Sequence, residues 1–274
     1  MTRDRDHLLA GGLVVLAVVL AVNSVFGPLV LGAVTYPFSE SVLYQTIGLE
    51  AVSLLVVAPW SLVAGVLVWR SHPVGPVLGI PPAAYTSYMF LQYVVGPQYL
   101  EYTPVVAAHL LIFVVSWLVL VRAWAGFDES VLPALSAHRR TGYVVLLAVL
   151  ALFTVSRYVA AVQGMVTGAP IAAEYATDPT MYWSIVFLDM GIVVPATLVT
   201  ALGLTKGATW ARKATYGVVG WFVLVPISVA AMSVVMLVNG DPNASVAQVA
   251  VLGIAALVFT GFAAWVYRPL VERR

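Results

Sequence analysis

Long uninterrupted apolar runs are the feature of this sequence that most constrains its fold. Hydrophobic residues make up 62% of the 274 residues and charged residues only 9%, whereas soluble domains carry about 25% charged residues. The runs are long enough for the roughly 20 helical residues that cross a hydrocarbon layer about 30 Å thick. They are continuous rather than alternating, which excludes a transmembrane β-barrel. The chain is therefore predicted to be an all-α, polytopic membrane protein.

We expect about eight transmembrane helices that form a bundle and a single integral membrane domain over residues 1–274. Their predicted ranges are 8–34, 47–69, 76–95, 104–124, 142–163, 181–204, 216–238 and 246–267. The first range is longer than the apolar region of a signal peptide, about 7–15 residues, so we expect it to be retained as a membrane helix.

The distribution of charge predicts the orientation of the bundle. If the N-terminus is cytoplasmic, the tails and inner loops hold all of the 13 Lys and Arg residues except Arg157. The outer loops then hold only acids, which are Glu40, Glu101, Glu174, Asp178 and Asp241. The positive-inside rule therefore predicts a plasma-membrane protein with both termini cytoplasmic. No internal repeat is evident, which leaves transporter-type repeats open.

Three ionisable residues lie inside the apolar segments: Glu50, Arg157 and Asp189. A charge in the bilayer core costs several kcal/mol on insertion scales, and such residues normally face one another or a water-filled cavity. Counted from the helix ends at about 1.5 Å per residue, all three lie in the outer half of the membrane. Two acids facing one base would favour a bound cation, or a proton on one carboxyl group.

Polar side chains from two further segments reach the same depth. Tyr85, Tyr88 and Gln92 share one face of the third segment, at i, i+3 and i+7, and His109 lies about a turn and a half into the fourth. The predicted ligand-binding residues of an outer pocket are Glu50, Tyr85, Tyr88, Gln92, His109, Arg157 and Asp189. The loop 164–180 is expected to cover this pocket, and Pro195 and Pro226 are expected to kink two of the helices.

Structural interpretations of the same residues remain open. Arg157 and Asp189 can form an ion pair that only fixes helix packing, and Glu50 and His109 can be solvated residues at the membrane boundary. Aromatic belts form at membrane surfaces whatever the function. That interpretation is favoured for Tyr93, Tyr99, Tyr102, Tyr182 and Trp183.

The sequence offers no signature of an enzyme. Cysteine is absent, which excludes disulfides, thiolate metal sites and thiol redox chemistry. No HExxH or similar metal-binding spacing occurs, and no phosphate-binding or dinucleotide-binding motif is present. We therefore predict no catalytic residue, metal site, cofactor or nucleic-acid partner. Asn243-Ala244-Ser245 matches a glycosylation sequon on the predicted outer side.

Residues 47–204 resemble a family of uncharacterised prokaryotic multi-pass membrane proteins, of archaeal and actinobacterial type. The resemblance lies in Gly48-Leu49-Glu50, the basic turn Arg70-Ser71-His72, the tyrosine-rich Ala84-Tyr85-Thr86-Ser87-Tyr88, and Thr177-Asp178-Pro179 leading to Leu188-Asp189 and Pro195. That family has no established activity, so the resemblance implies a shared pocket without implying a reaction.

Three functions are compatible with these patterns. The first is binding or transport of a small polar or cationic solute, with proton coupling as an option. The second is a non-transporting sensor or membrane subunit that acts with a protein partner or as a homo-oligomer. The third is a metal-dependent membrane enzyme that uses His109 and a carboxylate. In every case the lipid bilayer is a partner.

Overall fold

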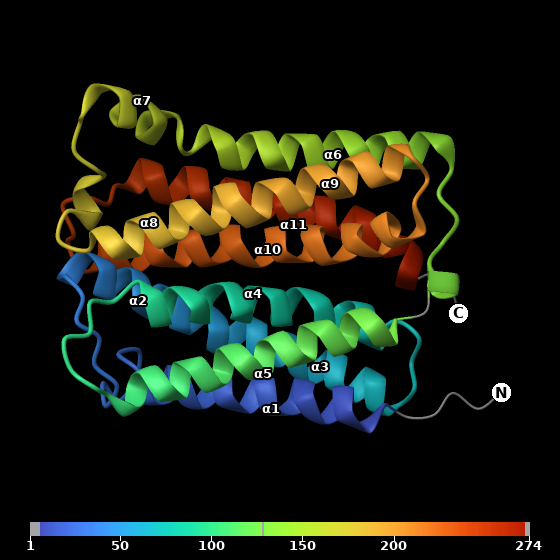
Figure 1. Ribbon diagram of the computed structural model, residues 1–274, viewed down its shortest axis with the longest axis horizontal. Coiled ribbons are helices and arrows are strands. Elements are labelled where there is room, and N and C mark those ends of the chain that lie inside the picture. The colour runs from blue at the N-terminus through green and yellow to red at the C-terminus, as the bar shows by residue number, and fades with distance from the viewer. Residues whose placement is uncertain (1–5, 128, 272–274) are drawn as a thin grey trace.

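The computed structural model describes residues 6–127 and 129–271, and these form a bundle of antiparallel helices without β-strands (Figure 1). Eight long helical rods lie side by side. In chain order they are α1 (His7–Phe26), α2–η1–α3 (Glu40–Val52, Ser53–Val57, Ala58–Trp69), α4 (Gly75–Val95), α5 (Pro104–Gly126), α6–α7 (Ala137–Ser156, Val159–Thr167), α8–η4–α9 (Pro179–Leu188, Asp189–Val193, Val194–Thr205), α10 (Thr209–Val238) and α11 (Val246–Val271). Two short 3₁₀ turns, η2 (Glu129–Val131) and η3 (Ala173–Tyr175), lie in loops.

Seven of these described rods are long and apolar enough to cross a membrane, and α4 is the eighth rod. α4 packs against α3, α5 and α10, and more than half of its residues are buried, among them Pro81, Pro82, Tyr85 and Gln92. It is less apolar than the other rods because protein surrounds most of it. The prediction of an all-α bundle with about eight helices is confirmed.

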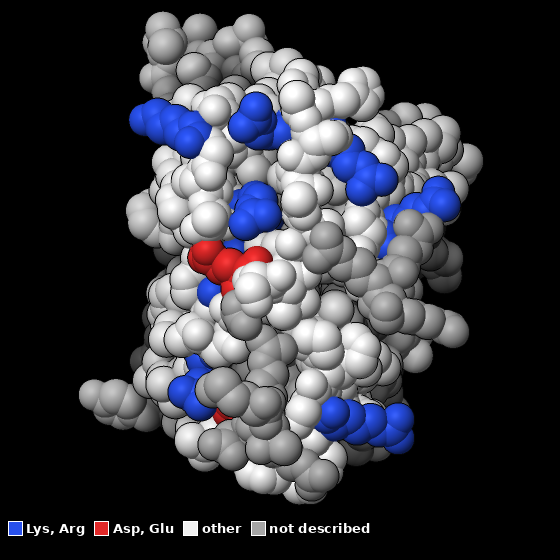
Figure 2. Space-filling view, turned by 90° about the vertical axis from the view of Figure 1, so that its right-hand side faces the viewer, with Lys and Arg blue, Asp and Glu red and all other residues white. Residues whose placement is uncertain are grey.

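Both chain ends lie at one end of the bundle, which we call the terminal end (Figure 1). Basic side chains are spread over the face at this end (Figure 2). Among them, Arg122 pairs with Asp6 at 2.9 Å. Lys213 is buried against the Trp124 ring and donates to the Trp124 carbonyl oxygen. Arg157 is the only basic residue in the half of the bundle near the opposite, distal end, within residues 6–127 and 129–271.

The first helix ends at Phe26, and the prediction that it continues to residue 34 is wrong. The Gly27 N–H closes the helix on the Asn23 carbonyl at 2.7 Å, and the following proline cannot donate to another turn. The chain then turns back, with Gly32 in the left-handed region at a φ of 59°. Residues 27–39 therefore form a loop at the distal end.

The fifth rod is broken where a continuous helix over 142–163 is predicted. The N–H groups of Arg157 and Tyr158 bond to Thr154 and Val155 in a tighter turn, at 3.3 and 3.0 Å. The short helix α7 follows the break and buries none of its residues. In Figure 1 α7 lies away from the rest of the bundle.

The bundle can be divided into two halves of four rods, in which successive rods pack in the same order. In each half the first rod packs on the second, the second on the third and the third on the fourth. Both halves begin at the terminal end, so corresponding rods run in the same direction (Figure 1). The halves meet where α10 packs on α2 and α4 and where α8 packs on α4.

The second rod of each half contains a buried acid, a π-helical turn and a proline, in that order. In the first half Glu50 precedes η1 and Pro59, and in the second half Asp189 opens η4 and Pro195 follows. π-helical turns re-aim neighbouring side chains and are frequent at functional sites. Each half thus has one buried acid near the π-helical turn of its second rod, and Glu50 lies three residues further from its proline than Asp189 does.

Candidate functional site

A cavity of about 480 Å³ lies between the two halves, towards the distal end. Residues of α2 and α4 line it from the first half, and residues of α7, α8, η4 and α10 line it from the second. Eight residues of the segment 164–175, within the loop 164–180 that was predicted to cover the pocket, also line it. The charged lining residues are Arg157, Glu174 and Asp189.

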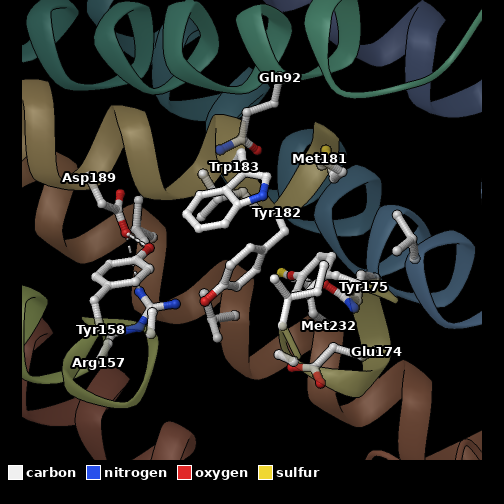
Figure 3. Close-up of a pocket in the computed structure, with 18 of the residues that line it drawn as sticks. Gln92, Arg157, Tyr158, Glu174, Tyr175, Met181, Tyr182, Trp183, Asp189 and Met232 are labelled. Atoms are coloured by element: carbon white, nitrogen blue, oxygen red, sulfur yellow. Dashed lines mark hydrogen bonds and ion pairs between the residues drawn. The ribbon is translucent and has the colours of Figure 1, made fainter. Parts of the chain in front are cut away.

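Asp189 is the most tightly held group of the cavity wall. Its side chain is buried, and each carboxylate oxygen accepts one short hydrogen bond. The Tyr88 hydroxyl donates to Oδ1 at 2.6 Å. The Tyr158 hydroxyl donates to Oδ2, also at 2.6 Å (Figure 3). Because the two tyrosines come from opposite halves, this carboxylate links the halves directly.

Arg157 supplies the positive charge next to Asp189. Its Nη1 lies 3.8 Å from Asp189 Oδ2, which is a long ion pair, and 37% of its side chain is exposed. The guanidinium therefore reaches the open space of the cavity as well as the carboxylate. It also borders a narrow crevice between α6, α10 and α11.

Glu174 lies on the loop side of the cavity and has no hydrogen bond or ion pair within the described part of the chain. Aromatic rings surround this part of the cavity. Tyr175 and Tyr182 lie with their ring centroids 5.5 Å apart, and Tyr182 and Trp183 lie 5.3 Å apart (Figure 3). The Tyr175 hydroxyl donates to Gln45 Oε1 at 2.7 Å. Burial raises the pKa of Tyr175 above its usual range, so this hydroxyl keeps its proton.

The remaining polar groups of the wall come from α4 and α10. The hydroxyls of Tyr85 and Ser228 share a hydrogen bond of 2.6 Å that joins the two helices. Gln92 also lines the cavity and is buried (Figure 3). The Tyr88 ring packs edge-on against Trp221 with centroids 5.3 Å apart. Both halves therefore supply fixed polar groups, which is the arrangement that gives a binding site its specificity.

Glu50 lies in a separate, closed cluster and does not line the cavity. Its Oε2 accepts from the Leu29 N–H at 3.1 Å and its Oε1 from the Tyr36 hydroxyl at 3.2 Å. A Cβ atom on Gly27 would overlap the Glu50 carboxyl group, so only glycine fits there. The loop 27–39 thus seals the Glu50 side chain, whose exposure is 1%.

His109 belongs to the same cluster as Glu50. Its Nε2 lies 3.1 Å from Asn23 Oδ1 and 3.5 Å from the Tyr36 hydroxyl. The His109 ring stacks on Tyr36 with centroids 5.6 Å apart and an interplanar angle of 17°. Tyr93 and Phe90 complete the aromatic shell. Burial, followed by the nearby Glu50, raises the pKa of Tyr36 above its usual range, so its hydroxyl remains a donor.

The structure thus divides the predicted pocket into two sites. Five of the predicted residues line the cavity: Tyr85, Tyr88, Gln92, Arg157 and Asp189. Glu50 and His109 do not line it, and they are buried rather than solvated at a boundary. The expectation that Glu50, Asp189 and Arg157 converge is wrong for Glu50, and the two acids that line the cavity are Asp189 and Glu174.

Several residues of the cavity wall lay outside the predicted set. Tyr158, Glu174, Tyr175 and Gln45 line the cavity, and Tyr182 and Trp183, which were assigned to an aromatic belt, also line it. Tyr158 could have been predicted as a site residue, because it directly follows Arg157, a charged residue inside an apolar segment. Nothing in the order of loop residues indicates that Glu174 and Tyr175 turn inwards.

Among residues 6–127 and 129–271, no group of three or more His, Asp or Glu side chains is arranged to hold a metal ion. No protein-family model, curated protein or solved structure matches the chain. The resemblance of residues 47–204 to a prokaryotic membrane family therefore stays a prediction, and the function is argued from the geometry of the cavity.

Proposed function

We propose that this protein binds a small organic cation in the cavity between its halves and carries it across the membrane. The observation that supports this most strongly is the position of the cavity at the interface of two repeated four-helix halves. Transporters built from repeats bind their substrates at such interfaces, and movement of one half against the other exposes the site alternately to the two sides. Pro195 and Pro226, in the second and third rods of the second half, are suited to such movement.

The charge and the walls of the cavity favour a cation as the ligand. Two carboxylates and one guanidinium line it, which leaves one negative charge in excess. Arg157 lies beside Asp189, whereas Glu174 is free to meet a ligand. Tyr175 and Tyr182 lie within electrostatic reach of that carboxylate. Trp183 also lines the cavity, and aromatic faces attract organic cations.

The orientation proposed for the protein follows from its charges. The basic terminal end faces the cytoplasm of a plasma-membrane protein, and the cavity opens outwards. Glu174 is then the first charged wall residue that an incoming solute meets.

Binding of tetramethylammonium to the purified protein in nanodiscs, measured by calorimetry, tests the role of Glu174. We expect Glu174→Gln to weaken binding about tenfold, which corresponds to about 1.4 kcal/mol. The matched control is Glu101→Gln, since Glu101 is an exposed acid at the same end that does not line the cavity. If both variants lost the same affinity for tetramethylammonium, the effect would come from general surface charge and not from a contact with Glu174.

Uptake into proteoliposomes separates transport from binding alone. Accumulation of labelled tetramethylammonium that Glu174→Gln slows supports a transporter. Binding without uptake would replace this proposal with the sensor or partner-subunit function. Absence of binding to the wild type would contradict the cationic ligand itself.

A further inference from the structure

The closed cluster around Glu50 corresponds in position to the Asp189 site of the other half. Both acids lie close to a π-helical turn of the second rod: Glu50 lies three residues before η1, and Asp189 is the first residue of η4. Both contact the point where the first rod of their half ends or breaks: Glu50 meets Gly27 and Leu29 after α1, and Asp189 meets Arg157 and Tyr158 after α6. A tyrosine hydroxyl donates to each carboxyl group.

The two sites differ in one respect that bears on charge. Asp189 has Arg157 beside it, whereas Glu50 forms no ion pair within the part of the chain that the structure describes. The ionisable side chains that face the cluster are Tyr36 and Tyr99 from the loops, Tyr93 from α4 and His109 from α5. None of these carries a fixed positive charge. A carboxylate sealed in such a place is strongly disfavoured unless a cation compensates it.

The two ring nitrogens of His109 lie in different surroundings. Its Nε2 is bonded towards Asn23 and Tyr36. Its Nδ1 is buried near the Tyr93 carbonyl, in a geometry that makes no hydrogen bond. Tyr36 in turn links Nε2 to the Glu50 carboxyl group. Glu50, Tyr36 and His109 line neither the cavity between the halves nor the crevice beside α6.

We infer that Glu50, Tyr36 and His109 form a proton-binding site. The bound proton compensates the negative charge of Glu50 in the first half, as Arg157 compensates that of Asp189 in the second half. A proton that arrives at His109 Nδ1 releases the proton on Nε2 to the Tyr36 oxygen. The Tyr36 hydroxyl proton passes to Glu50 in the same sequence. The cluster thereby gains one proton, Glu50 becomes a neutral carboxylic acid, and His109 is neutral again with its proton on the other nitrogen.

Infrared spectroscopy of the full-length protein in nanodiscs tests this site without any added ligand. We expect the carbonyl band of one protonated carboxylic acid at neutral pH, shifted when the protein contains isotope-labelled glutamate. The band should be absent in Glu50→Gln and retained in Asp189→Asn. No labelled band in the wild type, or a band that persists in Glu50→Gln, would overturn the proposal.

Two further measurements keep the test independent of how well the variant folds. Glu50 is the only buried glutamate among the described residues, so the labelled wild type is informative even if Glu50→Gln does not fold. His109→Phe should retain the band but slow its deuterium exchange at least tenfold, because the relay is removed. Unchanged exchange would exclude His109 from the site. Because tetramethylammonium takes no part in these experiments, their outcome does not depend on the proposed transport function.

Discussion

Replacing Asp189 by asparagine is expected to abolish tetramethylammonium binding, with an affinity at least a hundredfold below that of the wild type. The wall then holds one carboxylate and one guanidinium, so its negative excess disappears. Arg157 also loses the partner that lies 3.8 Å away, and its charge repels an incoming cation. Calorimetry on nanodisc-embedded protein measures the loss of binding.

The same variant is also expected to be less stable. Removing one member of a fully buried ion pair costs roughly 3–5 kcal/mol. Arg157 retains 37% exposure of its side chain, so water and headgroups compensate part of the loss, and about 1–3 kcal/mol is expected here. This loss of stability is measured as a lower thermal unfolding midpoint of Asp189→Asn than of the wild type in detergent.

The double variant Arg157→Gln/Asp189→Asn serves as the control for charge balance. It removes both members of the pair and leaves Glu174 to provide the single negative excess. We therefore expect binding to recover to within about tenfold of the wild type, since a tenfold change corresponds to about 1.4 kcal/mol. A double variant as weak as Asp189→Asn would identify Asp189, instead of Glu174, as the direct ligand of the cation.

Replacing Gly48 by leucine is expected to separate the two halves and to have the largest effect on folding. A Cβ atom at this position would lie 2.5 Å from the Met232 backbone nitrogen and 2.8 Å from the Ala231 carbonyl carbon. Backbone atoms of α10 cannot move aside as a side chain can, so the contact between α2 and α10 must open. Overpacking of this kind typically lowers the free energy of unfolding by about 1–3 kcal/mol. Because the new side chain meets backbone atoms, we expect Gly48→Leu to lose about 3 kcal/mol or more.

Fluorescence-detected size exclusion after heating measures the effect of Gly48→Leu. The matched control is Gly261→Leu on α11, where a Cβ atom meets nothing within 4 Å and the position is exposed. We expect a clearly lower unfolding midpoint for Gly48→Leu and little change for Gly261→Leu. Similar midpoints for the two variants would mean that the contact between α2 and α10 does not limit stability.

The depth of polar residues could be predicted from the sequence because helical rise converts position along a segment into position across the membrane. Tyr85, Tyr88, Arg157 and Asp189 were predicted to lie in one layer, and all of them line the cavity. Depth carries no information about which way a side chain points around the bundle axis. The sequence therefore grouped Glu50 with the other polar residues, although its side chain lies in the closed cluster.

The sequence by itself determined the eight-helix architecture and the gathering of basic residues at the terminal end, because apolar length and charge distribution are local properties of each segment. Only the tertiary structure decided that the halves repeat, that the loop bearing Glu174 and Tyr175 turns into the cavity, and that residues 27–39 seal Glu50. These features depend on contacts between segments far apart in the chain, such as Tyr88 with Asp189 and Tyr36 with His109. No local pattern encodes such pairings, since they are selected by the packing of whole helices against one another.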